Sequence, residues 1–127
     1  MSGQQLSRRE REIVDILYTK GDATAAEVRA AMNGDPSDAT VRTLLRILGE
    51  KGLVKHRVDG RLYRYRPIQP KQRAAKQALQ HVLKVFFGGS VEQALASHLA
   101  DPKNEIDAES LQRIRELIAE AEQRGQS

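Results

Sequence analysis

Residues 37–67 read SDATVRTLLRILGEKGLVKHRVDGRLYRYRP, and this stretch decides the fold. In its first half, apolar residues from Val41 to Leu48 recur at helical spacing, and a glycine follows the last turn. Its second half consists of two alternating runs joined by Asp59 and Gly60, a pair typical of a two-residue hairpin loop. The stretch therefore predicts a helix followed directly by a β-hairpin.

The predicted hairpin is strongly basic on one face. Closing it at Asp59 and Gly60 gives a register in which His56 faces Tyr63. The face that holds this pair is the more apolar one and is expected to pack on the helices, whereas the other face points to solvent or to a ligand. The candidate phosphate-binding residues of the hairpin are Lys55, Arg57, Arg61, Arg64 and Arg66.

Two helices are predicted upstream, each with a capping box at its start. Ser7 and Glu10 begin the first helix, and Thr24 and Glu27 begin the second. The sequence NGDP at 33–36 separates the second helix from the third as a turn. Three helices and a basic hairpin in this order are typical of a winged helix-turn-helix. In that fold the third helix enters the major groove of DNA, and the hairpin, or wing, lies along the phosphate backbone.

The outward face of the third helix is small, hydroxylated and basic. It lies opposite the apolar side, and Ser37 or Asp38 is expected to cap the helix. Arginine can donate hydrogen bonds to guanine edges or to phosphates, and threonine offers a hydroxyl and a methyl that suit phosphates and thymine methyls. The candidate DNA-contacting residues of this helix are Ser37, Thr40, Arg42, Thr43 and Arg46.

The net charge of +4 is concentrated around this helix and the hairpin. Residues 42–73 hold ten Lys and Arg but only two Asp and Glu. A positive field confined to one segment indicates a polyanionic partner, here double-stranded DNA. Two other interpretations stay open: a wing that docks an acidic protein without binding DNA, and a winged-helix regulator that responds to a small molecule in a dimer cleft.

Residues 71–127 are predicted to be helical and to form a homodimer. Three amphipathic segments there have too little core to stand alone, so a second copy of the chain is expected to cover them. Folding of this tail onto the first domain is the alternative. The expected architecture is mainly α with a small β-hairpin, with a winged helix-turn-helix at 1–70 and a helical dimerisation domain at 71–127. The residues assigned to dimer contacts are Leu79, Val82, Phe86, Leu95, Leu111, Ile114, Leu117 and Ile118.

Several functional classes are disfavoured by what the sequence lacks. It contains no cysteine, which excludes disulfides and thiolate metal sites, and none of His56, His81 and His98 has a second ligand at metal-binding spacing. No nucleophile-elbow, Walker or dinucleotide-binding pattern occurs, so we expect neither an enzyme nor a cofactor. Without a signal-peptide core or about 18 consecutive apolar residues, the chain is expected to be cytoplasmic and to have no membrane partner.

The sequence resembles the penicillinase-repressor family (BlaI/MecI/CopY type) over roughly residues 6–118. The resemblance rests on LSRREREIVDIL (6–17), on DATVRTLLRILGEKGLV (38–54) leading into GRLYRYRP (60–67), and on FGGSVEQAL (87–95). It implies a homodimeric repressor that binds a palindromic operator through an N-terminal winged helix and dimerises through C-terminal helices.

Two features of that family are missing from this chain. The Asn-Phe bond at which penicillinase repressors are cleaved is replaced by ALASHLA (94–100), with Ser97 and His98 near that place. The Cys-x-Cys pair of copper-responsive members is absent because the chain has no cysteine. Copper sensing through thiolates is therefore excluded. The identity of an upstream sensor or protease stays open.

Overall fold

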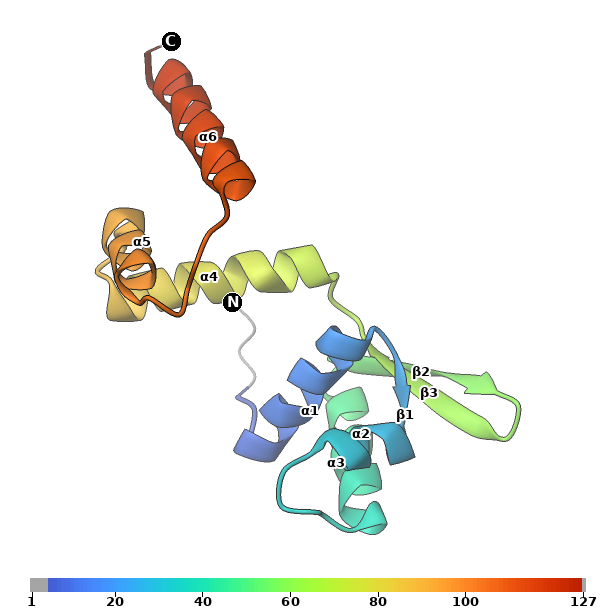
Figure 1. Cartoon of the computed structure of the whole chain (residues 1–127). Coiled ribbons are helices and arrows are strands. Elements are labelled where there is room, and N and C mark those ends of the chain that lie inside the picture. Colours follow the sequence, from blue (N-terminus) through green and yellow to red (C-terminus); the bar gives the residue numbers. More distant parts are fainter. Residues whose placement is uncertain (1–4, 127) are drawn as a thin grey trace. The chain divides into compact units, whose positions relative to one another are not determined.

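The computed structural model describes residues 5–126 and has the expected fold class, mainly α with a small sheet (Figure 1). Residues 1–4 and 127, at the outer ends of the two predicted domains, lie outside the described residues. The chain forms two compact units that divide at Gln77 and Ala78, whereas the sequence predicts a division at residue 70. The elements are α1 (Arg8–Lys20), β1 (Ala23–Thr24), α2 (Ala25–Ala31), α3 (Asp38–Glu50), β2 (Val54–Asp59), β3 (Leu62–Pro67), α4 (Lys71–Phe86), α5 (Val91–Ala100) and α6 (Ala108–Gln126).

The first unit is built around one hydrophobic core. Helices α1, α2 and α3 contact one another, and α1 also contacts β3. Each helix packs its apolar side against this core. The apolar residues of that side recur at the helical period, as the sequence predicts. The buried hydrophobic residues are Ile13, Leu17, Ala23, Val28, Met32, Val41, Leu45, Leu48 and Val54.

Local hydrogen bonds begin the three helices where the sequence predicts them. Oγ of Ser7 accepts the backbone N–H of Glu10 at 3.1 Å, and the Glu10 carboxylate accepts the N–H of Ser7 at 3.0 Å. Thr24 and Glu27 form the same reciprocal pair at the start of α2, and Ser37 caps α3. Each cap satisfies backbone N–H groups that the first helical turn leaves without partners.

The wing belongs to a three-stranded antiparallel sheet with the strand order β1-β3-β2. Only β2 and β3 were predicted, because β1 is two residues long and has no alternating pattern of its own. Ala23 pairs with Tyr65 and Thr24 pairs with Arg64. The short strand therefore ties the wing to the start of α2.

The predicted hairpin register is wrong by two residues. His56 faces Tyr65 and not Tyr63, and the two-residue loop is Gly60 and Arg61. Gly60 has a φ of +65°, so it supplies the positive φ that the first loop position of a type II′ turn requires. A shift of two residues preserves the alternation of side chains between the two faces. The basic residues of the strands still share one face: Lys55, Arg57, Arg64 and Arg66.

A partly buried ion pair joins the start of α1 to the residue after α3. The Glu10 side chain is 7% exposed, and its carboxylate accepts a hydrogen bond of 2.7 Å from Nζ of Lys51. It also accepts the backbone N–H of Ser7. Lys51 contributes most and Ser7 next, and together they hold the pKa of Glu10 below its ordinary value despite burial.

Glu10→Gln is expected to lower the free energy of unfolding near neutral pH by roughly 1–3 kcal/mol, because it removes the negative charge that strengthens the hydrogen bonds from Lys51 and Ser7. Since the pKa of Glu10 is lower in the folded chain than in the unfolded chain, this stabilisation is complete above the ordinary pKa of 4.5. It is lost as the pH falls through the folded value. Urea denaturation at about pH 7 and about pH 3 measures the free energy of unfolding of both chains. The difference in this free energy between wild type and variant should be smaller at the lower pH. Asp15→Asn, at an exposed α1 carboxylate, is the charge-matched control, and an equal loss in both variants would contradict this role of Glu10.

The second unit has no buried core of its own. Its helices have ordinary caps, since Oγ of Ser90 accepts the N–H of Gln93 at 3.1 Å and Oδ1 of Asp107 accepts the N–H of Ser110 at 2.7 Å. None of its described residues from 78 to 125 is buried. The large apolar side chains that it exposes are Leu79, Val82, Val85, Phe86, Val91, Leu99, Leu117 and Ile118.

Candidate nucleic-acid interface

The residues predicted to contact DNA from α3 lie on its exposed side. Val41, Leu45 and Leu48 are buried on the other side and hold the helix against the core. At the start of the helix, Oγ of Ser37 donates a hydrogen bond of 2.8 Å to Oγ1 of Thr40. The side that is open to solvent holds Ser37, Thr40, Arg42, Thr43 and Arg46.

Each arginine of this face is paired with an acid one turn away on the same helix. Nε of Arg42 lies 2.9 Å from Oδ2 of Asp38, and Nη1 of Arg46 lies 2.5 Å from Oε1 of Glu50. All four side chains are more than half exposed. Exposed pairs at this spacing contribute only about 0.3–0.5 kcal/mol. Either guanidinium can therefore exchange its carboxylate for a base edge or a phosphate at little cost.

The wing presents two like-charged pairs on its basic face. Lys55 lies opposite Arg66, and Arg57 lies opposite Arg64, while Arg61 lies in the loop. Like charges directly opposite each other in an antiparallel sheet are destabilising. A negatively charged partner, either within the chain or outside it, would relieve the repulsion within each pair.

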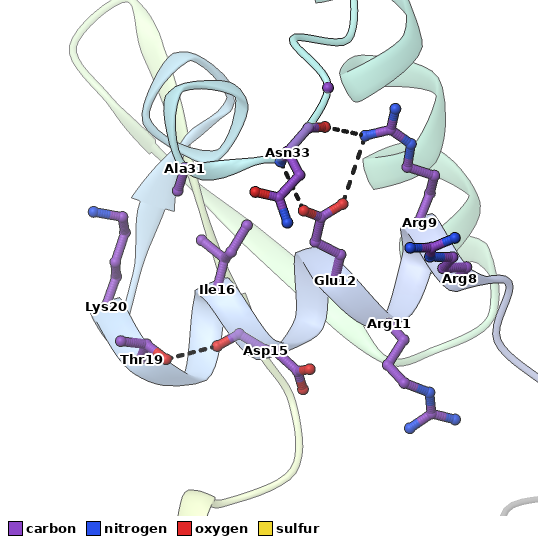
Figure 2. Close-up of a pocket in the computed structure, with 11 residues that line it drawn as sticks. Arg8, Arg9, Arg11, Glu12, Asp15, Ile16, Thr19, Lys20, Ala31 and Asn33 are labelled. Atoms are coloured by element: carbon purple, nitrogen blue, oxygen red, sulfur yellow. Dashed lines mark hydrogen bonds and ion pairs between the residues drawn. The ribbon is translucent and has the colours of Figure 1, made fainter.

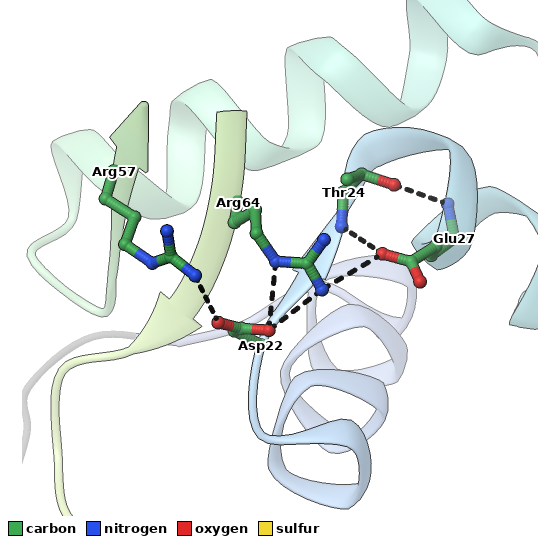
Figure 3. Close-up of polar contacts among 5 residues, drawn as sticks. All are labelled: Asp22, Thr24, Glu27, Arg57 and Arg64. Carbon is green, nitrogen blue, oxygen red and sulfur yellow. Dashed lines mark hydrogen bonds and ion pairs between the residues drawn. The ribbon is translucent and has the colours of Figure 1, made fainter. Parts of the chain in front are cut away.

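Asp22, which is not among the residues predicted from the sequence, supplies the negative partner of one pair (Figure 3). Its Oδ1 accepts two hydrogen bonds from Arg64, 3.2 Å from Nε and 3.0 Å from Nη2, and its Oδ2 lies 3.4 Å from Nη2 of Arg57. Glu27 adds a contact of 3.5 Å to Arg64. The hydrogen bonds from Arg64 hold the pKa of Asp22 below its ordinary value. The only local signal in the sequence is the position of Asp22 just before the capping box that begins at Thr24.

The second face of the wing changes from buried to exposed along its length. Val54 is buried and Tyr65 packs against the core, so burial raises the pKa of the Tyr65 hydroxyl. His56 stacks on Tyr63, with ring centroids 4.4 Å apart. Tyr63 and Val58 are 50% and 65% exposed. The predicted packing of this face on the helices therefore holds at the root of the wing and is wrong towards its tip.

A separate surface pocket lies between α1 and the turn after α2 (Figure 2). Nη1 of Arg9 donates a hydrogen bond of 2.7 Å to the carbonyl of Asn33, and the N–H of Asn33 donates one of 2.8 Å to Oε2 of Glu12. Arg9 and Glu12 also form an ion pair of 3.5 Å. These charges hold the turn between α2 and α3, and none of the predicted DNA-contacting residues lines the pocket.

The three histidines lie on different elements, His56 on β2, His81 on α4 and His98 on α5. Within residues 5–126, no three His, Asp or Glu side chains gather as a possible metal site. In the same part of the chain, no helix has the length and the apolar character needed to cross a lipid bilayer.

Three packed helices, an exposed basic face on the third and a basic wing define a winged-helix DNA-binding protein. The sequence pattern of the penicillinase repressors matches residues 6–120, so the chain belongs to the penicillinase-repressor family. It is therefore a DNA-binding transcriptional regulator.

Two solved structures that align with a TM-score of 0.50 or more share this fold. A variant of ZitR from Lactococcus lactis aligns with a TM-score of 0.53 and 20% identity over 97% of this chain and 77% of that one. The adhesin competence repressor AdcR from Streptococcus pyogenes aligns with a TM-score of 0.50 and 14% identity over 97% and 82%. The DNA-binding domain of the repressor BlaI aligns with a TM-score of 0.48 and 26% identity over 52% and 83%. No curated protein sequence matches the chain significantly.

Proposed function

We propose that this chain represses transcription as a homodimer bound to a palindromic operator. The observation that carries the proposal is the apolar surface of the second unit, where Phe86 is 73% and Leu117 is 62% exposed and no described residue is buried. Apolar surface of this kind is typical of a protein interface. A second copy of the chain is the proposed partner, because two-fold symmetry holds two recognition helices at the fixed spacing that a palindromic operator mirrors.

The proposed dimer interface covers the apolar sides of α4, α5 and α6. Some of its residues are strongly exposed in the single chain, and the others are half-buried. Pairing of two such surfaces would provide the core that the second unit lacks. The residues assigned to this interface are Leu79, Val82, Phe86, Leu95, Leu111, Ile114, Leu117 and Ile118.

In the proposed complex, α3 enters the major groove. Arg42 and Arg46 donate to guanine edges or to phosphates, and Thr40 and Thr43 contact phosphates or thymine methyls. Ser37, at the start of the helix, lies where backbone N–H groups favour a phosphate. All five side chains are exposed, which supports their assignment.

The wing supplies further phosphate contacts in this proposal. Lys55, Arg61 and Arg66 are exposed and have no acidic partner among the described residues. Arg57 is 59% exposed and keeps one long contact of 3.4 Å to Asp22. These four cations are available to neutralise phosphates, which contribute affinity without reading sequence.

Arg46→Ala tests the proposal. Wild type first selects its preferred sequence from random duplexes, and this selected duplex is compared with its scrambled version. Because the Arg46 side chain is 63% exposed, the variant should keep its stability. It should lose about 1–3 kcal/mol of binding to the selected duplex and relax the preference at one position per half-site.

Arg11→Ala, at an exposed arginine of α1, is the matched control and should bind as wild type does. A uniform loss over all duplexes would make Arg46 a phosphate contact and not a base contact. Equal binding of wild type to selected and scrambled duplexes would contradict the proposed function, because docking to an acidic protein alone predicts no preference.

A further inference from the structure

The two like-charged pairs of the wing have different surroundings. Lys55 and Arg66 have no acidic neighbour among the described residues, whereas Arg57 and Arg64 share Asp22. Both pairs lie on the same face of the same hairpin, so the face that they share does not explain why their surroundings differ. Among the described residues, an acidic side chain, that of Asp22, lies next to one pair only.

Arg64 is the more firmly held member of its pair. Its guanidinium makes two hydrogen bonds to Asp22 and a contact of 3.5 Å to Glu27, and its side chain is 25% exposed. The Arg57 side chain is 59% exposed and has one contact of 3.4 Å. A half-buried guanidinium with two acidic partners is poorly placed to bind a phosphate.

Asp22 is placed to join the helices to both strands of the wing. It lies between α1 and β1, while Arg57 belongs to β2 and Arg64 to β3 (Figure 3). Glu27, the second acidic partner of Arg64, belongs to α2 and caps that helix together with Thr24. The two carboxylates therefore connect the wing to the helical body that carries α3.

We propose that Asp22 is a positioning residue that braces the wing against the helices, and that Arg64 acts through this brace and does not touch phosphate. The brace holds the wing in place relative to α3, so that both meet one duplex without a further cost in conformational ordering. This inference rests on the proposed function, because it assigns Asp22 a role in DNA binding.

The direction in which duplex affinity changes when the Asp22 carboxylate is removed distinguishes a brace from charge screening. Removing an acidic residue near bound DNA ordinarily strengthens binding to every duplex, because repulsion of the phosphates is lost. The brace predicts the opposite: Asp22→Asn weakens binding to the selected duplex about tenfold, without changing the slope of log affinity against log salt. Arg66→Ala, which removes a free cation from the same face, flattens that slope by about one per half-site.

The experiment titrates wild type, Asp22→Asn, Arg64→Ala and the double variant with both duplexes over a range of salt. The double variant should bind no more weakly than either single variant, because all three lose the same contact. Asp15→Asn controls for the change of charge and should leave affinity unchanged.

Either of two results with Asp22→Asn would overturn the brace. Tighter binding of Asp22→Asn to both duplexes with a steeper salt slope would show that Asp22 only screens the wing. A lower melting temperature with unchanged affinity would show that the contact serves folding alone. If Asp22→Asn does not fold, Arg64→Lys takes its place, because lysine keeps the charge and loses the forked pairing. Weaker binding of that variant at an unchanged slope supports the brace, and wild-type affinity overturns it.

Amide hydrogen exchange without DNA tests the brace apart from the proposed function. The amides of β1 and β3 should exchange faster in Asp22→Asn than in wild type, because the restraint on the sheet is lost. Unchanged exchange would overturn the brace. Faster exchange together with equal binding of wild type to both duplexes would remove the proposed function and leave the structural contact in place.

Discussion

Leu117→Asp is expected to prevent dimerisation and to reduce binding of the selected duplex to the non-specific level. Leu117 lies on the apolar side of α6 and is 62% exposed in the single chain. In a dimer the new carboxylate would be buried without a partner, which is costly. Specific binding exceeds non-specific binding by a factor of about 10³ or more, so the expected loss is of that size. Leu79→Asp on α4 should act in the same way.

Sedimentation and duplex titration measure the two effects separately. The contribution of the first unit to the circular dichroism signal should be largely retained, because that unit has its own core. Ala119→Asp, at an exposed position of α6 away from the Leu117 side, adds the same charge and should leave both dimer and affinity intact. A Leu117→Asp chain that is monomeric and still binds the selected duplex as tightly as wild type would show that dimerisation is not the source of selectivity.

Leu48→Ala is expected to lower the free energy of unfolding by about 2–5 kcal/mol. Leu48 is 0% exposed on the inner side of α3, so its truncation leaves a cavity between α3 and the other helices. Domains of this size are stable by only about 5–15 kcal/mol. The loss therefore removes a large part of the stability and loosens the helix that carries the recognition face.

Ile47→Ala is the matched control for the core. Ile47 is the preceding residue of α3 and is only half-buried, so its truncation should cost less than about 1.5 kcal/mol. Urea denaturation measures both variants under the same conditions. An equal loss in the free energy of unfolding for both variants would mean that burial against the core is not what holds α3 in place.

The local features of this protein follow from its sequence alone. Ser7, Thr24 and Ser37 each accept a backbone N–H three positions on, so both partners of each cap lie within one helical turn. The apolar period then decides which side of α3 is buried and leaves Arg42 and Arg46 on the outside. The alternating strands likewise place the basic side chains of the wing on one face. Local hydrogen bonding and periodicity therefore suffice for the helices, the hairpin and the two candidate DNA-binding faces.

The pairing of the strands was decided by tertiary structure. β1 is two residues long and exists because Ala23 and Thr24 meet β3. Asp59-Gly60 and Gly60-Arg61 both place a glycine in a two-residue loop, so composition alone leaves two registers open. The observed register puts Gly60, with its positive φ, first in the loop and places Tyr65 against the core.

The charge network was decided in the same way. Glu10 meets Lys51 41 positions further along the chain, and Asp22 meets Arg64 42 positions further along. Charges attract neighbours in space, whatever their separation in sequence, so such pairs depend on how the helices and the sheet pack. The sequence alone determined how many positive charges the wing carries. Only the tertiary structure decided which of them are free, because it alone brings Asp22 and Glu27 to Arg64.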